Sequence, residues 1–342
     1  MLLCTFVSVN IQTKKLFKQA LFLSIGIGLV WWSFSRTNLT FDAFWNGAKS
    51  MNYGFFAISA VFAMASHYSR ALRWKLLIES TGHRPKTKNV FASVLFMYAS
   101  NVAIPRSGEV ARCGTLYKYE GIPVPQLLGT VFIERAFDLL TLLFFTGLLL
   151  ILQFDLFSNL YFKSSLPDLV TSVINNRVMI IVLSLLSLIC LILLYKLRKK
   201  IFSLSPMKKV EKLLRELKAS FIQVFKMKTK GLFFLHTLVI WIGYVGMFYI
   251  CFFAYEPTSN LSLAAGLTAF IAGSFGMVAP TTGGAGAWQI MVIMALTALN
   301  VQEESATIWA NVAFVVMTIT VVIAGLISFA VLPYMNKTEK FS

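Results

Sequence analysis

The sequence is poor in charged side chains, and acidic ones are the scarcest. Only 13% of its 342 residues are charged, and 31 lysines and arginines outnumber 14 aspartates and glutamates. Soluble domains carry about 25% charged residues, so this chain has too few of them to cover a solvated surface of its size. An apolar content of 57% and a mean hydropathy of +0.73 therefore indicate an integral membrane protein.

Cysteine, histidine and enzyme motifs are also scarce. The four cysteines form no CxxC and the three histidines are scattered, so we expect no disulfide framework, no metal site and no cofactor. The chain has no GxSxG, HExxH or paired-aspartate signature, and no cytoplasmic segment long enough for a nucleotide-sugar fold. We therefore expect no catalytic residue and no enzyme activity. No basic stretch precedes the apolar residues 1–9, so no cleaved signal peptide is expected.

Long apolar runs are abundant. A helix that spans a bilayer needs roughly 20 mainly apolar residues. Six stretches of this kind occur, and they predict about six spanning helices in an all-α polytopic membrane protein. They are 17–34, 53–72, 127–153, 178–195, 231–254 and 305–332.

Two shorter apolar stretches are interrupted in the same way. Each ends at a proline that is followed three residues later by glycine, Pro105 with Gly108 and Pro280 with Gly283, and a second short helical stretch comes next. Proline removes a backbone donor and glycine frees the backbone dihedrals, so both pairs predict broken or re-entrant helical hairpins. The paired stretches are 89–104 with 109–119, and 262–279 with 285–299.

The basic residues predict the orientation of the chain. With a cytoplasmic N-terminus, the inner segments hold 23 lysines and arginines and the outer segments hold 4, as the positive-inside rule requires. Both termini are then cytoplasmic, and the excess charge needs no nucleic acid to explain it. The two hairpins enter from opposite sides, which predicts an inverted repeat within a single domain, residues 1–342. Residues 206–228 predict an amphipathic helix on the cytoplasmic leaflet or, equally, an ordinary linker helix.

Ionisable residues within apolar stretches are the first functional candidates, because burying them in a membrane is costly. One group surrounds the first break. Its helix N-terminus and arginines suit a phosphate or carboxylate, whereas a Glu109–Arg112 pair that only fixes the hairpin is the alternative. The group comprises Asn101, Pro105, Arg106, Gly108, Glu109 and Arg112.

A second group lies within the apolar stretch 127–153. Glu134 and Asp138 share a helix face, so a cation, a proton or water must relieve their repulsion. Arg135 lies on a neighbouring face, and Arg106 or Arg112 can approach from the hairpin. These charges bind a substrate or tie helices together.

The second break and the end of the second span supply the remaining candidates. The glycine-rich element around the second break allows a ligand or a helix to approach the backbone closely, or makes a tight turn. It lacks the features of a nucleotide-binding loop. Arg70 and Arg73 are secondary candidates for a lipid phosphate, although a positively charged cytoplasmic flank is the simpler interpretation. The element's candidate residues are Pro280, Gly283, Gly284, Gly286 and Gln289.

At these positions the sequence resembles the lysylphosphatidylglycerol synthase transmembrane family, also called the flippase-like domain family. The matching pieces are RALRWKLL at 70–77, NVAIPRSGEVAR at 101–112, ERAFD at 134–138 and PTTGGAGAWQ at 280–289. They occur in the family's order, over roughly residues 20–340. The family's second break usually reads PxPGGxGxxE, and here Thr282 and Gln289 replace the second proline and the acid.

The resemblance implies a membrane domain that moves a lipid between leaflets without the appended synthase domain. We expect a flippase-like transporter of a bacterial inner membrane, with a phospholipid or a polyprenyl-phosphate-linked lipid as its partner. A separately encoded lipid-modifying enzyme and a second copy of the chain are possible further partners. The alternatives are a membrane enzyme or accessory subunit of polyprenyl-phosphate or glycolipid assembly, and an assembly partner of a lipid synthase.

Overall fold

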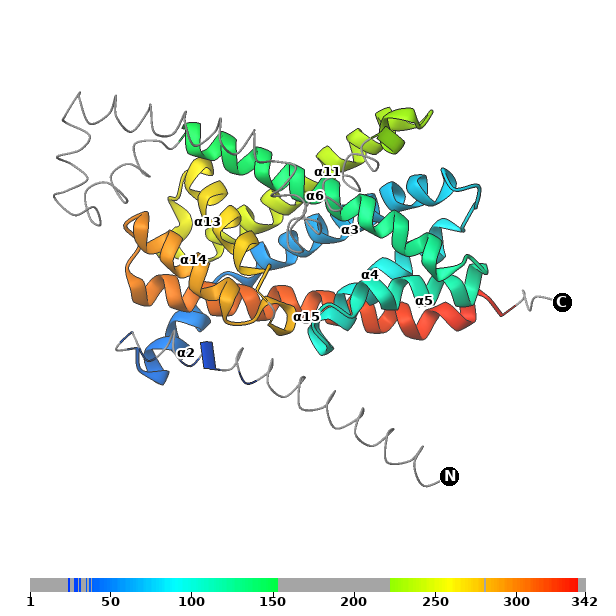
Figure 1. Ribbon diagram of the computed structural model, residues 1–342. Coiled ribbons are helices and arrows are strands. Elements are labelled where there is room, and N and C mark those ends of the chain that lie inside the picture. The colour runs from blue at the N-terminus through cyan, green and yellow to red at the C-terminus, as the bar shows by residue number, and fades with distance from the viewer. Residues whose placement is uncertain are drawn as a thin grey trace, which may run out of the picture. The chain divides into compact units, whose positions relative to one another are not determined.

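The computed structural model describes residues 39–152, 222–279 and 281–337, and a few single positions before residue 39 (Figure 1). Its regular elements there are all helical, which confirms the all-α class. Two compact units divide the chain, residues 1–142 with 228–342 and residues 143–227, and the site described below lies in the first. Single-domain organisation stays a prediction. The predicted span 178–195, Pro280, and most of the stretches 17–34 and 206–228 lie outside the described residues.

The helices follow the predicted stretches, with one difference that matters for the site. The predicted span 53–72 continues to Glu79, so Arg70 and Arg73 lie well inside the helix and not at its end. The first helices are α2 (Phe41–Ser50), α3 (Tyr53–Glu79), α4 (Thr87–Ala103), α5 (Gly108–Glu120) and α6 (Val124–Leu152). The later elements are α11 (Lys230–Ile250), η1 (Cys251–Ala254), α12 (Glu256–Ser259), α13 (Leu263–Gly276), η2 (Thr282–Gly284), α14 (Ala287–Ala298) and α15 (Glu303–Met335).

Helices α4 and α5 form the first broken pair, and a close backbone approach holds them together. The Asn101 side-chain oxygen accepts a hydrogen bond from the Gly108 backbone N–H at 2.8 Å. A Cβ atom on Gly108 would overlap the backbone oxygen of Met97 on α4. Arg106, in the connection, has a positive φ of 60°, which non-glycine residues adopt rarely. The glycine at 108 is therefore required by the space between the two helices.

Helices α13 and α14 form the second broken pair. Gly276 lies against α14, where an added Cβ would come within 2.7 Å of the Ala287 backbone oxygen. Between the helices, Gly283, Gly284 and Gly286 have φ values of 59°, 83° and 80°, in the left-handed region that glycine adopts without strain. The glycine-rich sequence thus forms a tight turn between two helices.

The two breaks lie against each other. The Arg106 guanidinium donates a hydrogen bond to the Val278 backbone oxygen at 3.0 Å, and an added Cβ on Gly283 would lie 3.3 Å from the Val102 side chain. Each break thus occurs where the sequence predicts it. The re-entrant placement of these helix pairs in a bilayer and their inverted symmetry stay predictions.

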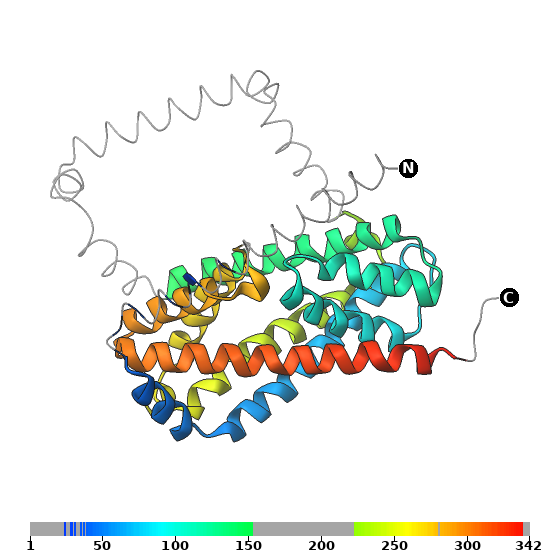
Figure 2. The same ribbon diagram turned by 90° about the horizontal axis from the view of Figure 1, so that it is seen from below.

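The long helix α15 runs alongside both broken pairs (Figure 2). Gly325 permits its approach to α4, because an added Cβ would lie 2.7 Å from the Leu95 backbone oxygen. Nearer its beginning, Trp309 joins an aromatic core, with its ring 5.5 Å from Phe248 and its indole N–H donating to the Cys251 oxygen at 2.8 Å. One helix therefore packs against both broken pairs.

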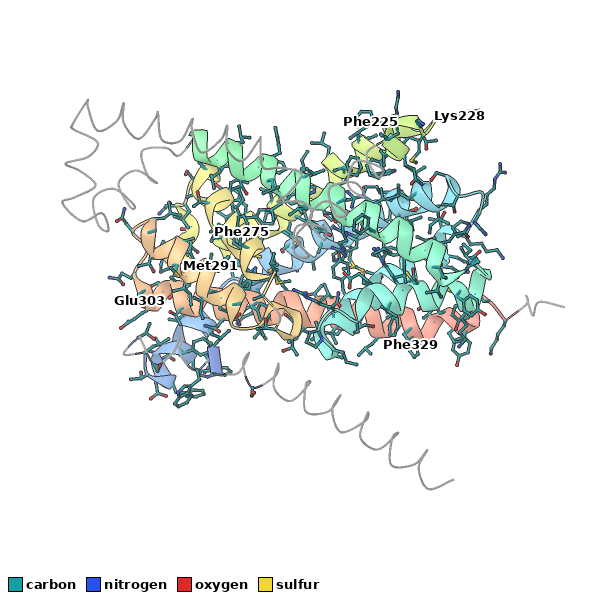
Figure 3. All side chains as sticks on the ribbon, viewed as in Figure 1. Phe225, Lys228, Phe275, Met291, Glu303 and Phe329 are labelled. Atoms are coloured by element: carbon teal, nitrogen blue, oxygen red, sulfur yellow. The ribbon has the colours of Figure 1, made fainter. Side chains whose placement is uncertain are left out.

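Two helices in the described part of the chain are long and apolar enough to cross a membrane, Lys230–Ala254 and Glu303–Met335. Figure 3 labels Glu303 and Phe329 towards opposite ends of the second of these. Apolar side chains more than half exposed recur along it, which fits contact with lipid tails. They include Val315, Ile319, Ile323, Leu326, Ile327 and Phe329.

The close approach at Gly108 predicts a stability change. Gly108→Ala should destabilise the protein by about 1–3 kcal/mol, because the new methyl group overpacks the contact with Met97. Thermal unfolding in detergent measures the effect. Gly114→Ala, in the same helix with open space around its Cβ, is the matched control, and it should be neutral or stabilising by about 0.5–1 kcal/mol. Equal behaviour of the two variants would contradict the packing described here.

Candidate functional site

Helices α3 and α6 present complementary charges to each other. Arg70 and Arg73 lie three residues apart on α3, and Glu134 and Asp138 lie four apart on α6, so each pair shares a helix face. Arg70 binds both carboxylates, at 2.5 Å to Glu134 and 3.0 Å to Asp138. Arg73 lies 2.6 Å from Asp138 and 3.6 Å from Glu134. Two arginines thus relieve the repulsion that the sequence predicts between the two carboxylates.

Arg112 of α5 completes the contacts of Glu134. Its Nη1 atom lies 3.0 Å from Glu134 Oε2, and both side chains are 0% exposed. The guanidinium also lies over the Trp74 ring at 4.3 Å, a cation–π contact. Within the described residues, its Nε and Nη2 atoms have no hydrogen-bond partner. Arg112 is therefore held by one carboxylate and one aromatic ring, and its Nε and Nη2 donors make no hydrogen bond within the described residues.

The half-buried side chains Glu109 and Arg135 form the exposed edge of this group. Arg135 lies 3.1 Å from Glu109 and 3.8 Å from Asp138. The exposed fractions of the Arg135 and Glu109 side chains are 41% and 26%. The Glu109–Arg112 pair that the sequence offered as an alternative is replaced by Glu109–Arg135 and Arg112–Glu134. Helix periodicity placed residues 109 and 112 on one face, but the partner of each comes from α6.

These seven side chains form one connected group, which we call the arginine–carboxylate cluster. Four arginines and three carboxylates leave it with one net positive charge among the described residues. Buried ions are costly unless they are paired and hydrogen-bonded. The cluster is therefore suited to receive one anion. Its members are Arg70, Arg73, Glu109, Arg112, Glu134, Arg135 and Asp138.

Two tyrosines that the sequence analysis missed extend the cluster. Arg70 Nε donates to the Tyr244 hydroxyl at 3.0 Å, and this hydroxyl shares a hydrogen bond of 2.7 Å with that of Tyr98. The His67 ring lies against Tyr98 in a tilted arrangement, with a centroid distance of 4.2 Å. Tyrosine in an apolar helix is commonplace, so the sequence carried no signal for these contacts.

The other predicted site residues lie outside the cluster. Exposed Arg106 binds the Val278 backbone and joins the two breaks. The Gln289 side-chain oxygen accepts a hydrogen bond from the Gly286 backbone N–H at 2.7 Å, at the start of α14. Asn101 fixes the first break. Arg70 and Arg73, which the sequence favoured as a cytoplasmic flank, are instead buried in the cluster because α3 is longer than predicted.

Comparison with known proteins identifies the class. Residues 19–325 match the family model described as the lysylphosphatidylglycerol synthase TM region, so the chain belongs to this family of membrane proteins. Over 96 residues it is also 27% identical to a protein named Glycosyltransferase AglD from Haloferax volcanii, a match that covers 28% of this chain. The chain spans about 15% of that relative's length. No solved structure matches it.

The shared carboxylates predict a large effect of removing one of them. Asp138→Asn should destabilise the protein by about 3–5 kcal/mol, because Arg70 and Arg73 lose a buried counter-charge. Chemical denaturation in detergent measures the change. Adding Arg73→Met to this variant should restore much of the loss, because fewer positive charges then lack a partner.

Asp42→Asn is the matched control for this substitution. Asp42 is an exposed residue in the first turn of α2, so its loss should cost no more than about 1 kcal/mol. If Asp138→Asn lost as little stability as Asp42→Asn, the structural role of the cluster would be refuted.

Proposed function

We propose that the protein is a flippase-like membrane transporter that moves an anionic or lipid-linked headgroup between the leaflets of the membrane. The observation that carries this proposal is the arginine–carboxylate cluster, a largely buried ionic group with one net positive charge among the described residues. Charged groups within membrane helices commonly mark the path of a polar substrate. Arginine is also the side chain best suited to bind a phosphate through two parallel hydrogen bonds.

The two broken helix pairs support the same function. Transporters commonly build their sites at interrupted helices and move two repeats about that site. In this chain the breaks at Arg106 and Val278 touch, and α5 carries Arg112 from the first break into the cluster. A headgroup would bind between the halves while its acyl chains remain in lipid. Membership of the family supports a lipid as the substrate.

The proposed setting follows from the charge distribution of the sequence. We place the protein in a bacterial inner membrane as a multi-pass protein with both termini in the cytoplasm, because the basic residues concentrate in the inner segments. The two helix pairs would enter the bilayer from opposite sides as an inverted repeat. The sequence has no ATP-binding motif, so a gradient or the consumption of the lipid would drive transport.

A second candidate function rests on the glycosyltransferase relative. Similarity to 15% of a protein with that name favours a membrane enzyme or accessory subunit in polyprenyl-phosphate or glycolipid assembly. Glu134 or Asp138 would then act as a base, although both are bound by arginines. This candidate predicts product formation in detergent, where there is no second compartment. Copurification with a separately encoded lipid-modifying enzyme would support an accessory role.

Transport predicts a specific effect of Arg112. Protein reconstituted in vesicles should accelerate the movement of an anionic phospholipid or a polyprenyl phosphate between leaflets. Arg112→Ala should slow this movement by at least about tenfold, because a charged hydrogen-bond donor at the site is worth about 1.5–3 kcal/mol. A headgroup-labelled lipid and a membrane-impermeant quencher measure the rate.

Arg84→Ala is the control for this experiment, because Arg84 lies in an exposed loop and should transport at the wild-type rate. Native mass spectrometry of copurified lipid supplies a second measurement, with the lipid present in wild type and lost in Arg112→Ala. Absence of acceleration for every anionic lipid tried would reject the transporter proposal. Wild-type rates in Arg106→Ala and Arg112→Ala would favour a purely structural or assembly role.

A further inference from the structure

The net charge of the arginine–carboxylate cluster bears on which headgroup it accepts. Glu134 and Asp138 are shared among three buried arginines, and Glu109 is paired with Arg135. The cluster therefore carries one positive charge in excess among the described residues. A buried charge without a partner is costly in a medium of low polarity. A ligand with one negative charge would make the cluster neutral, whereas a cationic ligand would add to the excess.

Arg112 is the member of the cluster at which an anionic ligand can compensate the excess positive charge. Its guanidinium is fully buried, lies over Trp74, and has no hydrogen-bond partner for Nε or Nη2 within the described residues. These two N–H groups lie on one edge of the planar guanidinium and point in parallel. Two oxygens on one phosphorus fit such an edge in a bidentate arrangement, and a single-atom anion does not.

The pair Glu109–Arg135 is the part of the cluster that a ligand would meet first, because its side chains are the least buried. Glu109 and Arg135 are the most exposed members of the cluster, and Glu109 lies one helical turn before Arg112 on α5. This half-buried pair is less desolvated than the fully buried pair of Arg112 and Glu134, so it is the pair of the cluster that separates most readily. A phosphate that parts Glu109 from Arg135 would meet the face of α5 that also carries Arg112.

We propose that the arginine–carboxylate cluster binds one phosphodiester monoanion at the free edge of Arg112, and that the protein selects headgroups by a net charge of minus one. This inference deepens the proposed function and rests on it for the lipid as substrate. It favours phosphatidylglycerol or a polyprenyl phosphodiester over zwitterionic, cationic and dianionic headgroups. Glycerophosphoglycerol, a soluble phosphodiester, shares the recognised chemistry.

Binding tests the inference without transport. The full chain is placed in phosphatidylcholine nanodiscs, and native mass spectrometry measures the binding of lipids with matched acyl chains. Phosphatidylglycerol should bind at least about tenfold more tightly than lysylphosphatidylglycerol or phosphatidic acid. Displacement of phosphatidylglycerol by glycerophosphoglycerol, or by a second phosphodiester lipid, supports the site. Failure of both competitors overturns it.

Two variants change the charge of the cluster in opposite directions. Glu109→Gln raises the net charge to two, so preference should move towards the phosphomonoester phosphatidic acid by about tenfold. Arg112→Gln makes the cluster neutral and should abolish the preference for phosphatidylglycerol. Arg112→Lys keeps the charge without the bidentate edge and should bind phosphatidylglycerol more weakly than wild type.

Glu79→Gln is the matched control for Glu109→Gln. Glu79 ends α3 and is 36% exposed beside Lys75, away from the cluster, so this variant should keep the wild-type order of lipids. The same order in Glu109→Gln, with unchanged thermal unfolding, would overturn the inference. If the protein binds lipids selectively but does not transport them, only the proposed transport function is rejected. If it transports lipids regardless of headgroup charge, only the inference about headgroup selection is rejected.

Discussion

The structure depends on the pairing of two charged helix faces, Arg70 and Arg73 of α3 with Glu134 and Asp138 of α6. Separating these helices in a medium of low polarity would leave four charges without partners, so the pairing fixes their register. It also determines where α5 can lie, because Arg112 reaches the remaining oxygen of Glu134. Buried ion pairs often contribute little to stability compared with apolar side chains of similar size. Removing one partner alone is nevertheless strongly destabilising, because the remaining charge is then buried without a counter-charge.

The sequence predicted the positions of the helices and their breaks better than it predicted the partners of the charges. Proline and glycine near residues 105 and 283 act locally, so both breaks could be predicted from neighbouring residues. Periodicity likewise showed that Glu134 and Asp138 share a face. It could not show that their cations come from α3, because Arg70 is 64 residues from Glu134 in the chain. An arginine at the end of an apolar stretch has the same sequence pattern whether it flanks a membrane span or pairs with a buried carboxylate.

The second break shows how a departure from the family pattern can leave a contact in place. Gln289 occupies the position where the family pattern has an acid, and its side-chain oxygen accepts a hydrogen bond from the Gly286 backbone N–H. This contact requires an acceptor and not a negative charge, so an amide fulfils it. The glycines with positive φ at 283, 284 and 286 then shape the turn. A tight turn was one of the two interpretations that the sequence allowed here, and the role of Gln289 within it became clear only from the hydrogen bond.

A transport site must release its ligand as well as bind it, and the composition of the cluster suits both steps. Three arginines without counter-charges would hold a phosphate too tightly for turnover, and they would be costly to bury in the empty state. Glu134 contacts all three of the buried arginines, so the empty site is largely neutralised by its own side chains. A ligand then adds to an ionic network that is already mostly paired. Under the proposed function, the small remaining charge would attract an anion without the strong hold of three uncompensated arginines.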